Sequence, residues 1–373
     1  MATYEYSRSI GMQFHITELC NLFCVHCYKG ESKKESSLKK KIKICDNYFQ
    51  AVKKLNAKFS LGLCGGEPFM SNHFWDILDY VSSNYDLKEK NLVVIGSNGT
   101  LITKNTVKRL SKYGALDSVQ VSLDGAKTNT HDMLRGKGSY ARALKGIQNL
   151  ANEHIPFSIH YVVHKLNYRE AFLIPQVAKK LGAHGLTVSR LVPIGHGRQL
   201  LKYMLSSHEL KTLLEALHKK EIILSVERFE EKTKMRILVN RCDWLPISTD
   251  IARIPAQFEQ NRPHCLIGHF STTIMADGTV YPCSRLRIPI GNILEQDFLD
   301  IWNHELLNKF RSRKIYIKGK CNYCQFCVDP QYNHLCGGGA ACISYAFYND
   351  PFKSDPQCWH QPQRRLYTCP ENI

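Results

Sequence analysis

The stretch MQFHIT (residues 12–17), followed closely by CNLFCVHCY (residues 20–28), decides the fold of this chain. The first run is apolar and indicates a buried strand. The second places three cysteines on the loop after that strand, at the spacing C-x3-C-x2-C. Three thiolates on one loop can ligate three irons of a four-iron cluster and leave the fourth iron open. A structural zinc site needs four ligands, so it would require His26 or a distant cysteine as well.

Outward from this stretch, the first two-thirds of the chain alternates strand and helix patterns. Further apolar runs lie at 59–64, 92–96, 119–123, 157–163 and 186–192. Helical patterns lie near 38–55, 71–83, 103–113, 139–153, 168–181 and 206–219. Six such βα units predict parallel strands with outer helices, and six is too few for a closed eight-unit barrel. We therefore expect an α/β fold with a partial (β/α)6 barrel over residues 1–220, with its chemistry where the strands end.

From about residue 264 the sequence changes in character. Elements become short, glycines cluster, and eight of the 15 cysteines lie between Cys265 and Cys358. A segment with so little apolar material is expected to fold around metal. The sequence predicts a small cysteine-rich domain over 264–373, joined to the barrel by a bridging region over 221–263.

Composition narrows the class of protein further. The 373 residues are 43 % hydrophobic and carry a formal net charge of +17. No apolar run reaches the roughly 18 residues of a membrane span, and no signal peptide is visible, so we expect a cytoplasmic protein without a membrane partner. Disulfides are rare in the cytoplasm, where clustered cysteines more often bind metal. Cys45 and Cys64 read as buried small hydrophobic residues, although Cys64 lies close enough to the next motif to leave a role in the site open.

Several motifs at the predicted strand ends accompany the cysteine loop. They are GGEP (65–68), SNGT (97–100), SLDG (122–125) and HDMLRG (131–136). Together with C-x3-C-x2-C, they resemble the radical S-adenosylmethionine (SAM) enzymes. The resemblance implies that Cys20, Cys24 and Cys27 hold a [4Fe-4S] cluster whose open iron binds SAM. It further implies reductive cleavage of SAM to a 5′-deoxyadenosyl radical, which abstracts a hydrogen atom from the substrate.

The same resemblance implies a set of SAM contacts. Glu67 would hold the amino group of SAM, since a carboxylate complements an ammonium and the two glycines before it allow close approach. Ser122 and Arg135 would contact the ribose or carboxylate, and Leu191 would pack near the adenine. For Ser97 and Asp124, turn formation is an equal alternative. The expected cofactor-binding residues are His26, Tyr28, Gly65, Gly66, Glu67, Asn98, Ser122, Arg135 and Leu191.

The C-terminal cysteines resemble the SPASM domain, an extension that carries two auxiliary iron–sulfur clusters. The implied ligands are Cys265, Cys283, Cys321, Cys324, Cys336, Cys342 and Cys358. Two fully ligated clusters need an eighth ligand, for which Cys327, Cys242 and Cys369 are the candidates; an open iron or a two-iron cluster are the alternatives. A four-cysteine zinc site is a further alternative, because C-x2-C pairs also build zinc ribbons.

The SPASM resemblance favours a peptide or protein substrate. The leading hypothesis is a maturase that installs a thioether or a carbon–carbon crosslink in a ribosomally made peptide. Residues 137–202 contain ten basic residues against Glu153 and Glu170, which would suit an acidic substrate. A reducing partner such as flavodoxin or ferredoxin is implied. We also expect either a separate leader-recognition protein or none.

Three alternatives to a peptide maturase stay open. RLVPIGHGR (190–198) resembles the branch that modifies tetrapyrrole side chains. A sulfatase-type maturase is disfavoured, because Ser284 stands where those enzymes place an aspartate. The last alternative is a non-catalytic iron–sulfur or zinc protein. The basic balance invites nucleic acid, but no helix-turn-helix or histidine-containing finger is present, so no nucleic-acid partner is expected.

Overall fold

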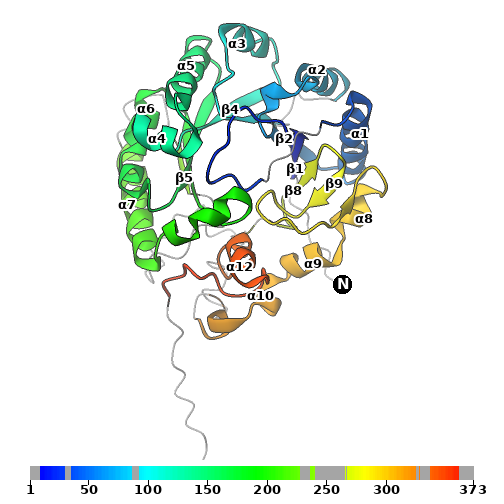
Figure 1. Ribbon diagram of the computed structural model, residues 1–373. Helices are drawn as coiled ribbons and strands as arrows, with labels where there is room; N and C mark the ends of the chain where they lie inside the picture. The colour runs from blue at the N-terminus through cyan, green and yellow to red at the C-terminus, as the bar shows by residue number, and fades with distance from the viewer. Residues whose placement is uncertain are drawn as a thin grey trace, which may run out of the picture.

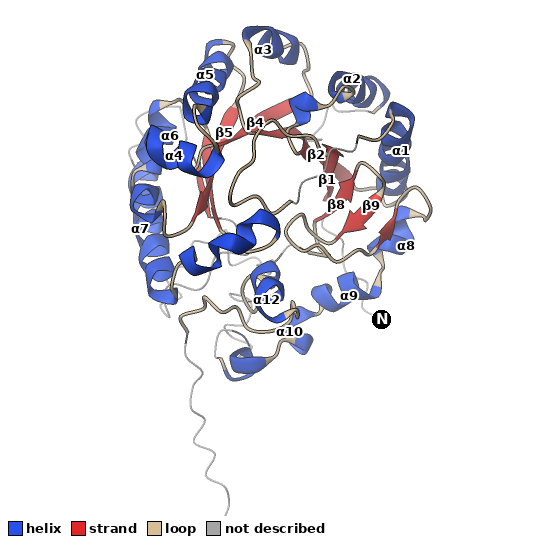
Figure 2. Cartoon of the chain, in the orientation of Figure 1, coloured by secondary structure: helices blue, strands red, loops and turns tan. Residues whose placement is uncertain are grey.

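The computed structural model describes residues 9–29, 35–85, 92–226, 236–239, 265, 267–324, 327 and 337–360. A curved sheet forms the inner wall of the molecule and helices cover its outer face (Figure 1, Figure 2). The loop after the first strand, residues 18–29, crosses the space inside the sheet and is called the cluster loop below. Within the described residues, no helix is both long and apolar enough to cross a membrane.

Seven strands build the barrel wall in chain order. They are β1 (Ser9–Thr17), β2 (Lys58–Gly65), β3 (Leu92–Ser97), β4 (Leu116–Ser122), β5 (Phe157–Val163), β6 (Gly185–Arg190) and β7 (Arg236–Val239). Each is parallel to the next. The six strands predicted from the apolar runs are confirmed. Strands covered on both faces are apolar along their length, which is why the runs were visible in the sequence.

Helices follow the strands as the pattern predicts. They are α1 (Leu38–Lys54), α2 (Phe74–Asn84), α3 (Lys104–Leu110), α4 (Thr128–Arg135), α5 (Ser139–Asn152), α6 (Ile174–Lys180) and α7 (Ser207–Val226), with short 3-10 helices η1 (Pro68–Met70), η2 (Tyr168–Phe172) and η3 (Gly195–Tyr203). The single helix expected over 168–181 is two elements, η2 and α6. Pro175 lies in the first turn of α6, where its missing N–H leaves no helical hydrogen bond unmade. In the middle of one continuous α-helix it would remove such a bond, so η2 and α6 are separate elements. Cys45 is fully buried on α1, as predicted.

The cysteine-rich part begins by extending the barrel sheet. Strand β8 (Ser271–Met275) lies parallel to β1, followed by β9 (Thr279–Tyr281) and β10 (Gly291–Asn292). Short helices then close one side of the ring: α8 (Phe298–Trp302), α9 (Glu305–Arg311), α10 (Arg313–Tyr316), η7 (Gly319–Tyr323) and α12 (Ala341–Tyr348). The predicted bridging region lies mostly outside the described residues, and the domain limits stay predictions.

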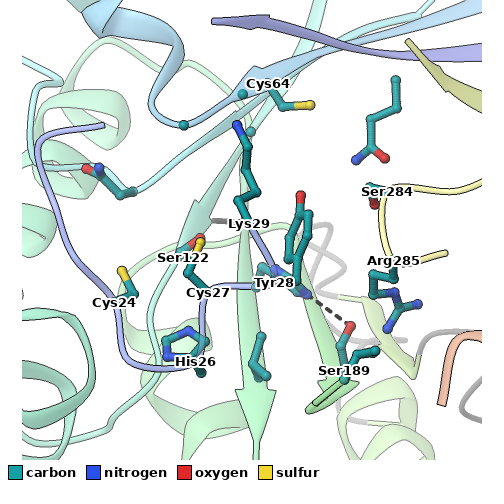
Figure 3. A pocket seen from close by; sticks show the side chains of 18 of the residues that line it. Cys24, His26, Cys27, Tyr28, Lys29, Cys64, Ser122, Ser189, Ser284 and Arg285 are labelled. Carbon is teal, nitrogen blue, oxygen red and sulfur yellow. Dashed lines mark hydrogen bonds between the residues drawn. The ribbon is translucent and has the colours of Figure 1, made fainter. Parts of the chain in front are cut away.

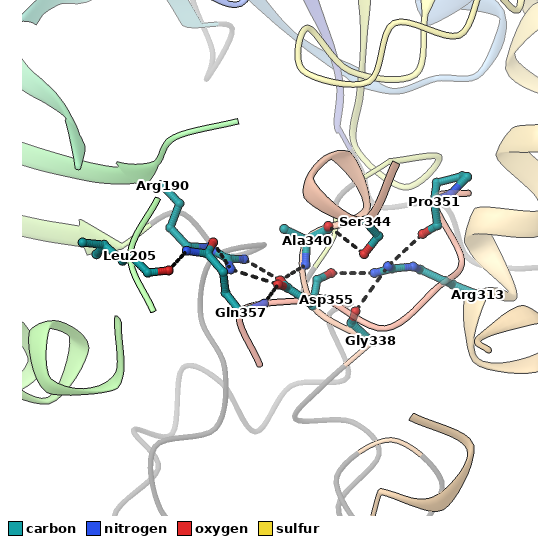
Figure 4. Close-up of polar contacts among 10 residues, drawn as sticks. Arg190, Leu205, Arg313, Gly338, Ala340, Ser344, Pro351, Asp355 and Gln357 are labelled. Atoms are coloured by element: carbon teal, nitrogen blue, oxygen red, sulfur yellow. Dashed lines mark hydrogen bonds and ion pairs between the residues drawn. The ribbon is translucent and has the colours of Figure 1, made fainter. Parts of the chain in front are cut away.

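A buried ion pair joins the two parts of the chain (Figure 4). Arg190, the last residue of β6, forms two contacts with Asp355, of 2.8 and 3.2 Å. Arg190 also donates to Gln357, whose amide donates in turn to the Leu205 carbonyl at 2.7 Å. Asp355 accepts from the backbone N–H of Ala340 at 2.9 Å, just before α12. This set of contacts fixes the C-terminal segment against the end of the sixth barrel strand.

Candidate active site

A cavity of about 920 Å³ lies at the carboxyl ends of the barrel strands and is shown from close by in Figure 3. Both parts of the chain line it. The cluster loop contributes one set of predicted ligands and the cysteine-rich part another. The cysteines that line this cavity, apart from Cys64, are Cys20, Cys24, Cys27, Cys265, Cys283 and Cys342. The fold therefore brings the predicted catalytic thiols and part of the predicted auxiliary set to one cavity.

The end of β2 holds the start of the cluster loop. The N–H of Gly66 donates to the Thr17 carbonyl at 2.9 Å, and the N–H of Glu67 donates to the Leu19 carbonyl at 2.8 Å. A Cβ atom at Gly66 would lie 2.1 Å from the Leu19 carbonyl oxygen. Gly65 and Gly66 also line the cavity. The two glycines are therefore required first by the close approach of the chain to itself.

Glu67 is fully buried and is not among the residues that line the cavity. Its carboxylate accepts from the Ser97 hydroxyl at 2.9 Å and the Asn98 N–H at 2.7 Å. Burial raises the pKa of Glu67 to about 7, against the lowering effect of these hydrogen bonds. Asn98 in turn donates to Asn21 on the cluster loop at 2.9 Å. These contacts link the ends of β2 and β3 to the loop, and the contact between Glu67 and SAM stays a prediction.

Asp124, just after β4, is the centre of a second buried network. Its carboxylate accepts from Arg135 Nε at 2.6 Å and the Val162 N–H at 2.8 Å, and it lies 2.9 Å from His26 Nε2. Burial alone would raise the pKa of Asp124, but Arg135 and His26 hold it well below its ordinary value. Arg135 reaches Cys24 Sγ at 3.7 Å. The charged network thus fixes the cluster loop from the β4 side.

The three loop cysteines suit an iron–sulfur cluster. They lie on one loop, carry free thiols and face the cavity. Burial raises the pKa of Cys20, and raises that of Cys24 to about 11 although Arg135 lowers it. The thiols must lose their protons when they bind iron, and the nearby Arg135 favours the thiolate form of Cys24.

His26 contacts the barrel, and Tyr28 contacts the cysteine-rich part. His26 faces Asp124, whereas the Tyr28 hydroxyl lies near Ser284 in the cysteine-rich part. The guanidinium of Arg287 lies 5.6 Å from the centroid of the Tyr28 ring. Ser122 and Leu191 line the cavity as predicted residues of the site. The expected position of His26 and Tyr28 beside the adenine of SAM stays a prediction.

The auxiliary cysteines fall into two groups. Cys265, Cys283 and Cys342 face the cavity. Cys321, Cys324 and Cys327 lie together and buried elsewhere; the Cys327 N–H donates to the Cys324 carbonyl at 2.9 Å. The hydrogen bond with Cys327 lowers the pKa of Cys321 to about 7. The role of Cys327 as the eighth ligand stays a prediction. Cys358 is buried, and Cys336, Cys242 and Cys369 lie outside the described residues.

Sequence reasoning left one residue of this site undecided and missed another. Asp124 had turn formation as an equal alternative, yet it is fully buried among charges. An acidic residue directly after a parallel strand was the available signal. Lys29, the residue after Tyr28, lines the cavity and was not singled out. No spacing marked it, because a lysine at the end of a loop is an ordinary surface pattern.

The fold and the cavity define an α/β-barrel iron–sulfur enzyme. The profile of the Radical SAM superfamily matches residues 14–173, and that of an iron–sulfur cluster-binding domain, SPASM, matches residues 265–327. The chain belongs to the radical SAM superfamily, in the group that carries a SPASM domain. It is therefore an enzyme whose cofactors are SAM, the cluster that binds it and auxiliary iron–sulfur centres.

Relatives and solved structures agree with this assignment. The chain is 30 % identical over 356 residues to the AdoMet-dependent heme synthase of Methanosarcina barkeri, covering 94 % of this chain and 97 % of the relative. It is 27 % identical over 337 residues to the antilisterial bacteriocin subtilosin biosynthesis protein AlbA of Bacillus subtilis, covering 87 % and 67 %. The solved structure of anSMEcpe with bound AdoMet and the Cp18Cys peptide is similar in fold, with a TM-score of 0.71, 18 % identity and 94 % of each chain covered.

Proposed function

We propose that this enzyme modifies a side chain of a tetrapyrrole by radical SAM chemistry. The observation that carries the proposal is the similarity to the AdoMet-dependent heme synthase, which extends over 97 % of that relative. The similarity to AlbA is lower and covers 67 % of AlbA. The higher identity and coverage of the heme synthase therefore support a tetrapyrrole substrate over the peptide substrate that the sequence motifs favoured.

The charges around the cavity suit a substrate that carries carboxylates. Lys29 and Arg285 line it, and Glu18 is the one acidic side chain among the lining residues. Arg135 and Arg190 also line it, but Asp124 and Asp355 compensate their charges. Tetrapyrrole precursors of heme carry several carboxylate side chains on a flat apolar ring. A cavity of about 920 Å³ is in the range of sites for ligands of that size. A cationic wall attracts such a substrate and orients its carboxylates.

In this proposal the chain holds the reacting groups together and keeps water away. SAM and its cluster, when bound, supply one-electron chemistry that removes a hydrogen atom from an unactivated carbon. Cys20, Cys24 and Cys27 would hold that cluster. Cys265, Cys283 and Cys342 would place an auxiliary cluster on the same cavity, within reach of an electron released by the substrate. The buried network around Asp124 keeps the cluster loop in one position.

The test uses the anaerobically reconstituted enzyme with SAM, a reductant and iron-loaded coproporphyrin III. We expect SAM cleavage together with a mass change of the tetrapyrrole, both measured by mass spectrometry. The variant Cys24→Ala is expected to lose both activities, because the catalytic cluster loses a ligand. Cleavage of SAM without any change in the tetrapyrrole would contradict the proposal.

A peptide substrate is the second candidate. It is supported by the similarity to AlbA, a bacteriocin biosynthesis protein, over 87 % of this chain. The same cationic cavity would suit an acidic peptide, presented with or without a leader-recognition protein. Incubation of the enzyme with candidate precursor peptides and SAM, followed by mass spectrometry, tests it. A crosslinked peptide alongside an unchanged tetrapyrrole would favour this candidate over the first.

A further inference from the structure

We propose that Lys29 binds a carboxylate of the substrate in the active-site cavity. Lys29 is the last described residue of the cluster loop and lines the cavity. It is 6 % exposed, and its ammonium has no hydrogen-bond partner within the described residues. Figure 3 shows the side chain extending from the loop toward Cys64 and away from Cys24. The inference rests on the proposed function, because it assigns a role to the carboxylates of that substrate.

Three other buried cations of the described chain have the carboxylate partner that Lys29 lacks, and a fourth, Arg313, donates to backbone carbonyls instead. Arg135 lies 2.6 Å from Asp124, and Arg190 lies 2.8 Å from Asp355. Lys41 lies 2.7 Å from Glu35. A buried charge without such a partner is costly, so protein interiors provide one. Lys29 is built into the wall of the cavity without a carboxylate from the described residues, and a carboxylate of the ligand would supply it.

The side chains around Lys29 form no ion pair with it within the described residues. Burial, and then the nearby charges of Lys29 and Arg287, hold the pKa of His15 well below its ordinary value. Both ring nitrogens of His15 are without hydrogen-bond partners within the described residues. Burial raises the pKa of Cys64 to about 12, so this thiol is neutral. The effect of Glu18 on Lys29 is smaller than that of Arg287, and the two side chains form no ion pair in the described part of the chain. This corner of the cavity is therefore positive and suited to an anion.

A carboxylate could come from the substrate or from SAM itself, and we assign it to the substrate. The loop residues that face SAM's cluster are the cysteines, whereas Lys29 extends toward Cys64 at the end of β2. A thermodynamic cycle separates the two sources. Binding of iron-loaded coproporphyrin III and of its iron-loaded amide derivative, which lacks the carboxylates, is measured by equilibrium dialysis with the SAM-loaded holoenzyme. The proteins compared are wild type, Lys29→Gln and Lys29→Arg.

The wild type is expected to bind the acid about tenfold to a hundredfold more tightly than Lys29→Gln does, the range of one charge-assisted hydrogen bond. The amide should bind both proteins equally, and Lys29→Arg should restore most of the affinity for the acid. The matched control is Lys108→Gln, which removes the same charge from the exposed face of α3 and should change neither affinity.

Three results would overturn the inference. Equal losses for the acid and the amide in Lys29→Gln would mean that Lys29 shapes the cavity or the cluster instead. A loss of SAM affinity, with an unchanged ratio of acid to amide affinity, would assign Lys29 to SAM. If the wild type binds neither tetrapyrrole, the proposed function fails and the inference fails with it. In the first two cases the proposed function stands.

Discussion

Asp124 shows how a single buried charge positions a catalytic loop. The carboxylate contacts Arg135 and His26 and accepts a hydrogen bond from the backbone of β5. Arg135 also contacts the Cys24 thiol. All of these groups are buried, so each depends on the others for compensation of its charge or polarity. A residue of this kind is more sensitive to substitution than the exposed ion pairs of the same protein.

Substitution of Asp124 by Asn tests this dependence. The amide keeps the shape but leaves Arg135 buried without a counter-ion, so the free energy of unfolding should fall by about 3–5 kcal/mol. The control Glu215→Gln disrupts an exposed pair with Lys211 on α7 and should cost less than about 1 kcal/mol. Urea unfolding of both reconstituted variants provides the measurement. Equal losses would show that the network does not carry buried charge.

Three buried histidines make stability depend on pH. Burial lowers the pKa of His131, His160 and His164 to about 4, from 6.5. Between these values the unfolded chain binds more protons than the native one, so the free energy of unfolding falls as the pH falls from 6.5 toward 4. Glu67 acts in the opposite direction, because its pKa is raised from 4.5 to about 7. The three histidines outweigh the single glutamate, so the free energy of unfolding decreases on acidification.

Urea unfolding at pH 7.5, 6.5 and 5.5 measures this loss. The variant His164→Gln removes one of the three titrating rings, so its stability should depend less steeply on pH than that of the wild type. Stability that is constant or increases on acidification would contradict the assignment of neutral, buried rings.

At the scale of elements, the junction of β2 with the cluster loop is the tightest point of the site. An alanine Cβ at position 66 would lie 2.1 Å from the Leu19 carbonyl oxygen and 2.6 Å from that of Glu18. Gly66→Ala should therefore displace the loop that carries Cys20 and lower the rate of SAM cleavage about 100-fold, the scale of a misplacement near 1 Å.

A second glycine provides the control for that prediction. Gly114 lies in the turn before β4, and an alanine Cβ at this position would have no neighbouring atom within 4 Å. Gly114→Ala should leave SAM cleavage unchanged and shift the free energy of unfolding by no more than about 0.5 kcal/mol. SAM cleavage assays and iron determination on both variants give the answer, and a fully active Gly66→Ala enzyme would refute the proposed constraint.

The strands of the barrel could be predicted from sequence because their signal is local. Continuous apolar runs mark strands that are buried on both faces, and the motifs at their ends necessarily meet at one edge of the sheet. Strand β8 could not be predicted in this way. Its sequence, STTIM, is short and half polar, and its position is set by pairing with β1. Pairing between distant segments leaves no mark on local periodicity.

The site was predictable to a similar degree. Cysteine spacing placed the three loop thiols on the cavity, and Ser122 and Leu191 line it as well. The carboxylate of Glu67 also accepts hydrogen bonds from the end of β3, which a motif alone does not reveal. Lys29 is distinguished only by what surrounds it, namely burial without a partner within the described residues. Roles that depend on three-dimensional surroundings could not be predicted from the sequence.

At the scale of the whole molecule, the pair of Arg190 and Asp355 holds the C-terminal segment on the barrel. Asp355→Asn removes the charge that compensates Arg190, and a broken buried pair costs about 3–5 kcal/mol. The segment should open more often, so trypsin should cut after the exposed Lys353 about 100-fold faster. The control Asp350→Asn, which disrupts the more exposed pair with Lys318, should change the rate of cleavage much less. Equal rates in both variants would contradict the role given to Asp355.

The pairing of β1 with β8 has a consequence for biosynthesis. Thr273 on β8 contacts Gln13 on β1 at 3.2 Å, across 260 residues of chain. One edge of the first strand therefore stays unpaired until the ribosome has made that much more protein, which takes roughly 10–50 s at ordinary speeds of translation. An open strand edge is prone to aggregate during that time. The barrel can therefore be completed, and iron loaded into a finished site, only after translation has passed β8.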